Sequence, residues 1–502
     1  MKSFPRSRGV WAWASLGLVG SLLTAVAGPA SIPDNNWWYA PGFPGGRSVA
    51  MAAVFVGAAL LAAGWIGLAR YAAGERTGWL VAIAAAWLTP LALAPPLFSG
   101  DVYSYIAQGT ILHLGHNPYN TAPAALAGLH QSHVMSAVSP FWRHTTSPYG
   151  PLFLGLMSVV VSITGSHLIA GVLVTRALEL VGVGLLAVYV PRLARALGAD
   201  RARATWLAVL SPLLALELIA AAHNDVLMIG LLVAGVTVAL QGRPIQGVAL
   251  CALAATVKLP AFAGVLFIAV AWARSEPDRS ERVKLVVQSA LAALGVLAAV
   301  SIVTGLGFSW LTTSVFSTPA KVHLAITPST AAGWTVAGLL RDAGVAVGHR
   351  TVASAFGVVT LAITIISGAL LLWRVRVPKV ALYLGLLLLI AAACGPAAWP
   401  WYFSWGLVLL AACPGVQRSV ALATGAVIGI FLIKPNGILV LPVQSAPAVL
   451  AAYALIALVA WRSRHLFVPE APTRARETDA GDETSAPQRS ANVSTHQDLT
   501  RA

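Results

Sequence analysis

Apolar runs of about 16–23 residues recur along most of this chain and limit what it can fold into. The chain of 502 residues is 58% hydrophobic and 10% charged, with a mean hydropathy of +0.78. Such runs fit helices that cross a bilayer, where each backbone polar group needs a partner within the protein. The sequence therefore predicts an all-α polytopic membrane protein with about 12–14 transmembrane segments.

The expected spans are apolar segments separated by polar or basic loops. The first follows Lys2, Arg6 and Arg8 and resembles a signal peptide, but its apolar part has the length of a span, about 20 residues. We therefore expect an uncleaved first helix. The expected spans are 10–30, 49–70, 79–98, 168–190, 204–222, 226–241, 284–305, 352–373, 380–395, 402–413, 419–433 and 446–461.

The net charge of +15 would suggest a nucleic-acid partner in a soluble protein, but here it fits the cationic bias of cytoplasmic loops. With the N-terminus inside and each expected span crossing once, 24 of the 32 Lys and Arg lie in inner segments. This predicts cytoplasmic termini and no nucleic-acid partner. The outer loops then hold only Arg47, Arg143, Lys321, Arg341, Arg350 and Lys434.

Two apolar segments do not fit a single crossing. If 149–164 crossed, the basic cluster at 192–203 would lie outside, so we expect an interfacial helix there. The run 245–273 has Arg243 and Arg274 at its ends, which predicts two half-length helices that enter and return from the inside. The tip would be "VKLP" at 257–260, because a proline disfavours helix at the residue before it.

The chain divides into one membrane domain, 1–468, and a polar tail, 469–502, which is too poor in apolar residues to build a core and is expected to be a disordered cytoplasmic segment. The outer loop 99–167 is the expected catalytic region. The three cysteines lie in apolar runs and form no CxxC, and no dinucleotide, Walker or H-E-x-x-H motif is present. We therefore expect no cofactor and no bound metal.

Asp101 is the acid that stands out, in "SGDVYSYIAQG" at 99–109, directly after an apolar run. It can complement the dipole of a helix that starts there, with Ser99 as the cap. It can also be a general base at the mouth of an outer cavity. The acids expected in or beyond the outer half of the membrane are Asp34, Asp101, Glu179, Glu217, Asp225 and Asp342.

Three polar residues, His223, Asn224 and Asp225, fill the short outer connection between two expected spans. Asn and Asp are common turn residues, so the segment can simply make the turn. It can equally form a polar cluster that binds hydroxyls or orients a base. The sequence leaves both interpretations open.

Charges within the apolar runs are a second group of candidates. Arg176 and Glu179 lie three residues apart on one helix face, either as a buried pair or with Arg176 turned toward an anion. Lys258 has no partner nearby in sequence; it can bind an anion or extend to the interface. The aromatic run "WPWYFSW" at 399–405 fits an interface belt or a surface on which a sugar ring stacks.

Taken together, these stretches resemble the GT-C glycosyltransferases, and more narrowly the actinobacterial polyprenol-phosphomannose-dependent α-1,6-mannosyltransferases. The resemblance covers about 80–460 and implies a plasma-membrane enzyme whose site faces outside. Its donor would be polyprenyl-phosphomannose and its acceptor a mannan glycolipid of lipomannan synthesis, within membrane lipid. The stretches that carry it are "SGDVYSYIAQG", "GHNPY", "SPYGPLF", "AHNDVLMIG", "VKLPA" and "WPWYFSWG".

The resemblance also implies inversion at the sugar carbon, with Asp101 as the catalytic base, ionised because its loop is wet. Arg176 and Lys258 would neutralise the leaving phosphate, with Arg143 and Lys321 as further candidates. The absence of an Asp-x-Asp motif argues against an obligatory cation. The residues expected to bind sugar hydroxyls are Tyr103, Tyr105, His223, Asn224 and Asp225.

Three alternatives stay open from the sequence. The donor sugar could be arabinose or glucose, since side-chain types do not distinguish them. A secondary transporter also has intramembrane charges and re-entrant hairpins, although it usually shows two related halves. A lipid-sugar flippase would need the cations but not Asp101.

Overall fold

The computed structural model describes residues 7–32, 43–311, 324, 326–395 and 397–462. Over these residues the secondary structure is helical, apart from one isolated bridge between Ile433 and Leu439, which confirms the all-α prediction. Lys321 and the predicted tail at 469–502 lie outside the described residues.

Six described helices are long and apolar enough to cross a membrane, and a bent helix pair would make a seventh. This confirms a polytopic membrane protein, while the expected 12–14 spans stay a prediction, because several other apolar helices are only 10–17 residues long. The six are α1 (Arg8–Ser31), α2 with η1 (Gly46–Tyr71), α7 (Leu168–Ala196), α12 (Arg279–Val303), α15 (His349–Arg374) and η7 with α16 (Val377–Cys394).

The remaining helices connect or flank these six. Several of them occupy the sequence ranges of the expected spans but are shorter. They are α3 (Gly78–Leu93), α4 (Asp101–His113), η2 (Pro123–Ala127), α5 (Ser132–Ala137), α6 (Pro151–Thr164), α8 (Arg201–Ala208), the π-helix η3 (Leu214–Ala220), α9 (Asp225–Leu240), α10 (Pro244–Ala255), η4 (Leu259–Ala261), α11 (Phe262–Ala273), η5 (Ser309–Leu311), α14 (Pro328–Asp342), η8 (Pro400–Phe403), α17 (Ser404–Ala411), η9 (Val416–Arg418), α18 (Val420–Gly429), η10 (Val443–Ser445) and α19 (Ala446–Arg462).

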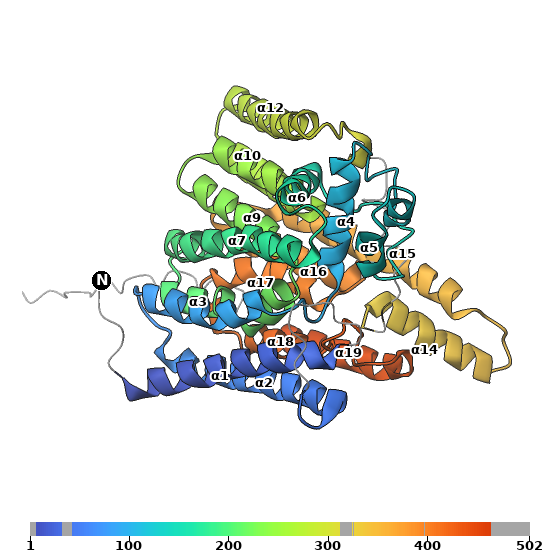
Figure 1. The fold of residues 1–502 in the computed structure, drawn as a ribbon. Coiled ribbons are helices and arrows are strands. Elements are labelled where there is room, and N and C mark those ends of the chain that lie inside the picture. The colour runs from blue at the N-terminus through green and yellow to red at the C-terminus, as the bar shows by residue number, and fades with distance from the viewer. Residues whose placement is uncertain (1–6, 33–42, 312–323, 325, 396, 463–502) are drawn as a thin grey trace, which may run out of the picture.

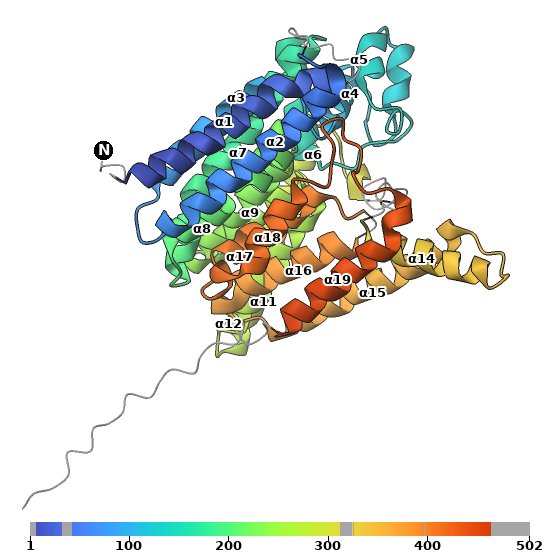
Figure 2. The same cartoon turned by 90° about the horizontal axis from the view of Figure 1, so that it is seen from below.

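The helices lie side by side in one bundle, with α4 and α5 at the end opposite the start of α1 (Figures 1 and 2). Basic loops that the sequence assigns to the inner side contact one another: Arg201 Nη1 is 2.8 Å from Glu75 Oε2, and the Gly74 amide donates to Asp200. Two of the loops that the charge pattern assigns to the same side therefore lie together.

The run 245–273 forms two half-length helices, as predicted. α10 and α11 pack against each other, and the helix breaks between Thr256 and Leu259. The tip of this hairpin binds the start of α6: the Gly150 amide donates to the Val257 carbonyl at 3.0 Å, and the Leu152 amide donates to the Thr256 carbonyl at 3.0 Å. Two of the sequence stretches that stood out, "VKLPA" and "SPYGPLF", thus meet at one point.

Gly150 is required for this contact because a Cβ there would lie 2.1 Å from the Thr256 carbonyl oxygen. We expect Gly150→Ala to lower the stability of the folded protein by about 1–3 kcal/mol, the usual range for overpacking. The measurement is the thermal unfolding midpoint in detergent.

Gly184→Ala, on the exposed side of α7 with open space around it, serves as the control and should not lower the midpoint. Equal midpoints for the Gly150 variant and the wild type would mean that the tip of the hairpin does not need this close approach.

Candidate active site

Asp101 begins α4 directly after a tight, strained turn. Phe98 has φ = 66°, a left-handed conformation that is uncommon for a residue with a side chain, and its amide donates to the Pro435 carbonyl at 2.8 Å. The N-cap of α4 is Gly100 and not Ser99 as expected; the Ser99 hydroxyl instead accepts a hydrogen bond from the Asp101 amide at 3.1 Å. These contacts hold the carboxylate at the end of the bundle.

His223 lies in the turn between η3 and α9, where the chain bends by 117°. The preceding residue, Ala222, is also left-handed, with φ = 57°, so strained backbone flanks both halves of the site. The ring of His223 is fully buried and stacks on Trp401 with a centroid distance of 3.9 Å. Its Nδ1 contacts the Glu217 carbonyl, and its Nε2 lies 3.8 Å from Asp101 Oδ2.

Asp225 and Lys258 form a second pair beside the first. Lys258 Nζ donates to both carboxylate oxygens of Asp225 at 2.9 Å, and the indole nitrogen of Trp405 donates to Oδ1 at 2.6 Å. The ammonium group also lies over the ring of Tyr402, 4.5 Å from its centroid. Asp225 is fully buried and Lys258 balances the charge of its carboxylate, which makes Asp225 a poor candidate for a free base.

The carboxyl of Asp101 is in a different electrostatic state from that of Asp225. Its side chain is 21% exposed, and burial raises its pKa, whereas the positive charges of protonated His223 and of Lys258 act to lower the pKa. Asp101 is thus less exposed than the wet loop expected from the sequence, and its ionised state stays a prediction. The charge of Lys258 favours the ionised form, since water reaches the group only in part.

The contacts of Arg176 do not support the prediction that it neutralises a phosphate. Its guanidinium is buried and donates to backbone carbonyls at the end of α3 and the end of η3, including Ala92 at 3.0 Å and Ala220 at 2.7 Å. Arg176 and Glu179 are both buried on α7, and their opposite charges interact, in line with the buried-pair alternative. Arg176 ties the ends of two segments together.

The remaining predicted residues divide into buried and peripheral ones. Tyr105 is packed edge-on against Tyr149 and Phe153, both with centroid distances of 4.9 Å, and its position gives no support to a sugar contact. Arg143 donates to the carbonyls of Ser136 and Val138 and so shapes the outer loop. Tyr103 is half-buried near Asp101 in sequence, and Asn224 is fully buried with no hydrogen-bond partner for its amide among the described residues.

The aromatic run contributes in a way that the sequence did not predict. Trp401 and Trp405 are buried and hold His223 and Asp225, respectively, and Tyr402 stacks on Trp405 with a centroid distance of 4.4 Å. The sequence signal was present, because five aromatic residues in seven are unusual. Their partners lie more than 140 residues away in the chain, so only the fold identifies them.

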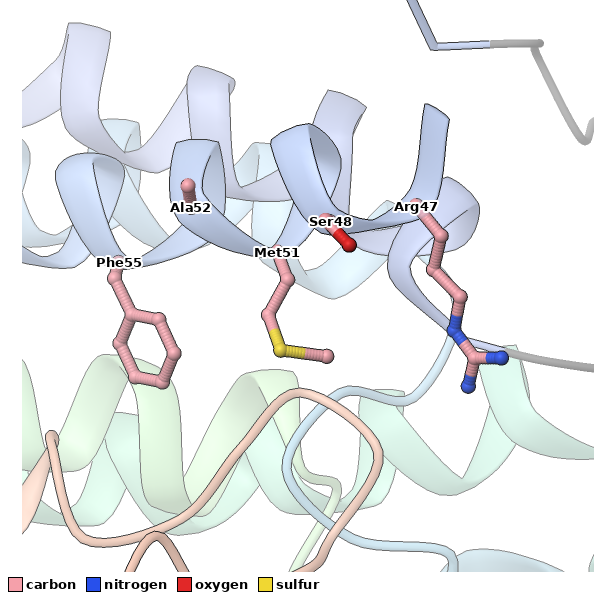
Figure 3. A pocket seen from close by; sticks show the side chains of 5 residues that line it. All are labelled: Arg47, Ser48, Met51, Ala52 and Phe55. Atoms are coloured by element: carbon pink, nitrogen blue, oxygen red, sulfur yellow. The ribbon is translucent and has the colours of Figure 1, made fainter. Parts of the chain in front are cut away.

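A shallow groove runs along α2 and is lined by Arg47, Ser48, Met51, Ala52 and Phe55 (Figure 3). None of the predicted site residues lines it. In the described part of the chain, no three His, Cys, Asp or Glu residues come together as a metal site. Among the described residues, Asp101, His223, Asp225 and Lys258 instead meet where α4, the η3–α9 turn, the hairpin tip and η8 converge.

These features define a multi-pass membrane protein with an acid–base cluster at one end of its helices. Residues 13–274 match the profile of the family described as alpha-(1->6)-mannopyranosyltransferase, N-terminal domain, and residues 329–463 match an MptB C-terminal domain. The chain belongs to this family of α-(1→6)-mannopyranosyltransferases, so its activity is mannosyl transfer.

Curated relatives agree with the family assignment. The chain is 36% identical over 395 residues to alpha-(1->6)-mannopyranosyltransferase A of Mycobacterium tuberculosis, covering 76% of this chain and 74% of the relative. It is 28% identical to alpha-(1->6)-mannopyranosyltransferase B of Corynebacterium glutamicum, covering 80% and 73%. No solved structure matches the chain.

The buried pair of Asp225 and Lys258 leads to a stability prediction. We expect Lys258→Met to destabilise the protein by about 3–5 kcal/mol, because it leaves the Asp225 carboxylate buried without a counter-charge. Adding Asp225→Asn should recover most of that loss. The thermal unfolding midpoints of the two single variants and the double variant in detergent measure the coupling.

Simple additivity of the two substitutions would contradict this assignment, since it would mean that the lysine and the carboxylate do not interact.

Proposed function

We propose that this protein transfers mannose, with inversion, from polyprenyl-phosphomannose to an α-1,6-mannan acceptor of lipomannan or lipoarabinomannan on the outer face of the plasma membrane. The proposal places it in the GT-C class, with the loop 99–167 providing the base. The observation that carries it is the position of Asp101, a partly exposed carboxylate opposite His223 and beside the pair of Asp225 and Lys258.

Asp101 is preferred over Asp225 as the base because the carboxylate of Asp101 has lone pairs that are free to accept a proton from the acceptor sugar. Asp225 accepts hydrogen bonds from Lys258 and Trp405 and is fully buried. Asp101 is partly exposed, with His223 beside it. A hydroxyl of the acceptor sugar can therefore donate to Asp101 and lose its proton as its oxygen attacks the anomeric carbon.

Lys258 is the cation in this cluster that can meet the leaving phosphate. As the bond between the sugar and the phosphate breaks, negative charge grows on the phosphate oxygen, and a fixed ammonium stabilises it most strongly in a dry site. Lys258 is 13% exposed and its positive charge acts on Asp101, so it lies near the reacting groups. Arg176 is excluded from this role by its carbonyl partners.

The outward orientation of the site is supported by the direction of the helices around it. α9 starts at Asp225 and ends at Leu240, just before Arg243, and α10 returns from there to the hairpin tip at Lys258. At about 1.5 Å per residue, α9 separates the cluster from that basic end by about 24 Å. If basic loops lie in the cytoplasm, the cluster faces outside.

Membership of the family weighs against the transporter and flippase alternatives. An arabinose or glucose donor stays a second possibility within the enzymes, and the same assay distinguishes it. The assay supplies membranes with radiolabelled polyprenyl-phosphomannose, or the corresponding arabinose lipid, and a short α-1,6-mannoside. Transfer from the arabinose lipid alone would contradict the proposed donor.

Asp101→Asn should lower transfer by about 10²–10⁴-fold, the contribution expected of a general base, while binding of the donor lipid stays near normal. Initial rates of mannose transfer measure this change. Asp342→Asn, which removes an exposed acid at the end of α14, is the matched control and should retain the wild-type rate. Wild-type turnover by the Asp101 variant would overturn the assignment of the base.

The role of Lys258 can be separated from its role in folding. The double variant Lys258→Met, Asp225→Asn removes the charges while leaving no buried carboxylate unpaired. We expect it to bind the donor lipid about 10–100-fold more weakly, since a hydrogen bond to a charged group contributes about 1.5–3 kcal/mol. Binding equal to wild type, measured with detergent-solubilised donor, would remove Lys258 from the donor site.

A further inference from the structure

We propose that His223 is a proton-accepting partner of Asp101, which takes the proton that Asp101 removes from the acceptor hydroxyl. This inference rests on the proposed function, in which Asp101 is the general base. It gives His223 a different role from the hydroxyl-binding one expected from the sequence.

The contact with Glu217 determines which nitrogen of the His223 ring carries a proton. A carbonyl oxygen can only accept, so Nδ1 must donate to it, and in the neutral ring the lone pair is on Nε2. Nε2 is the atom that lies toward Asp101, 3.8 Å from Oδ2, and it has no hydrogen-bond partner among the described residues. A fully buried nitrogen lone pair thus points at the carboxylate.

The distance of 3.8 Å is too long for a hydrogen bond, but it is typical of catalytic groups before substrate binds. A relative shift of about 1 Å would bring the two atoms into hydrogen-bond range. α4 and the η3–α9 turn carry the two groups, and the strained Ala222 and Phe98 flank them, so each group sits on a segment held in an uncommon backbone conformation.

Burial lowers the pKa of His223 and so disfavours a positive charge on its ring, but several neighbouring groups act in the opposite direction. Trp401 stacks on it, and the face of an indole attracts a cation. The charges of Asp101 and Asp225 favour the protonated ring and that of Lys258 disfavours it, so these groups offset only part of the penalty of burial. The titratable groups from the neighbouring elements are Asp101 on α4, Asp225 on α9, Lys258 before η4, and, facing both carboxylates, Tyr402 on η8 and Tyr149 before α6.

The proton can be followed through one turnover. The acceptor oxygen forms a bond to the anomeric carbon, the bond from that carbon to the phosphate oxygen breaks, and the phosphate leaves with the electron pair. The hydroxyl proton passes to a carboxylate oxygen of Asp101 and then to Nε2 of His223. Asp101 is again ionised, and the imidazolium releases the proton to water when the products leave.

His223→Asn tests the proposal because its amide can keep the donor to the Glu217 carbonyl while removing Nε2. Transfer needs ionised Asp101 and is lost as the pH falls through its pKa. In the proposed mechanism His223 is neutral before transfer, and the first proton that the pair takes up can sit on either residue. Removing one of the two acceptors should therefore move the acid limb of the turnover profile to lower pH. We expect turnover at neutral pH to fall about tenfold or more, with KM for the donor unchanged.

His116→Gln, in the exposed part of the outer loop, is the matched control and should leave the acid limb in place. His223→Gln is the second variant, because its amide reaches toward Asp101 but cannot accept a proton. Should both His223 variants fail to fold, Trp401→Leu removes the indole beneath the ring and should move the limb in the same direction by a smaller amount.

An acid limb that stays at its wild-type pH in these variants would overturn the proposal, and His223 would be a packing residue only. This failure can be told apart from failure of the proposed function. If Asp101→Asn abolishes transfer while the His223 variants keep the wild-type pH profile, only the role of His223 is lost. If Asp101→Asn turns over normally, the base itself is misassigned.

Discussion

The pair of Asp225 and Lys258 is the interaction on which the rest of the site depends. It joins the start of α9 to the tip of the α10–α11 hairpin, and Trp405 adds α17 to the same carboxylate. A buried charge is stable only with a partner and further hydrogen bonds, so these three segments cannot move apart independently. The hairpin tip in turn binds the start of α6, which follows the outer loop.

A second set of contacts brings Asp101 to this cluster. Arg176, in α7, donates to carbonyls that the ends of α3 and η3 leave free, and the Leu97 amide donates to the Ala220 carbonyl at 3.0 Å. The turn before Asp101 and the turn before His223 are thereby held together. An arginine that looks like an anion ligand in the sequence thus serves to align a carboxylate and an imidazole.

The sequence predicted the helical class and the two half-length helices of 245–273 correctly, and it singled out several residues that the fold brings together, because each of these rests on a local signal. Apolar length, a proline after Lys258 and polar residues in a tight connection all act over a few residues. It overestimated the exposure of Asp101, because exposure depends on what packs over the loop. It did not connect the aromatic run with His223 and Asp225, since nothing local links segments so far apart.

By itself, the sequence determined that this chain forms membrane helices, which of their ends carry basic loops, and which few acids and cations the other end holds. These follow from hydrophobicity and charge, which each residue carries wherever it lies. Only the tertiary structure decided which carboxylate is neutralised and which stays available, since that depends on distance and burial. Lys258 could have met either Asp101 or Asp225, and the packing of α9 against the hairpin gives it to Asp225.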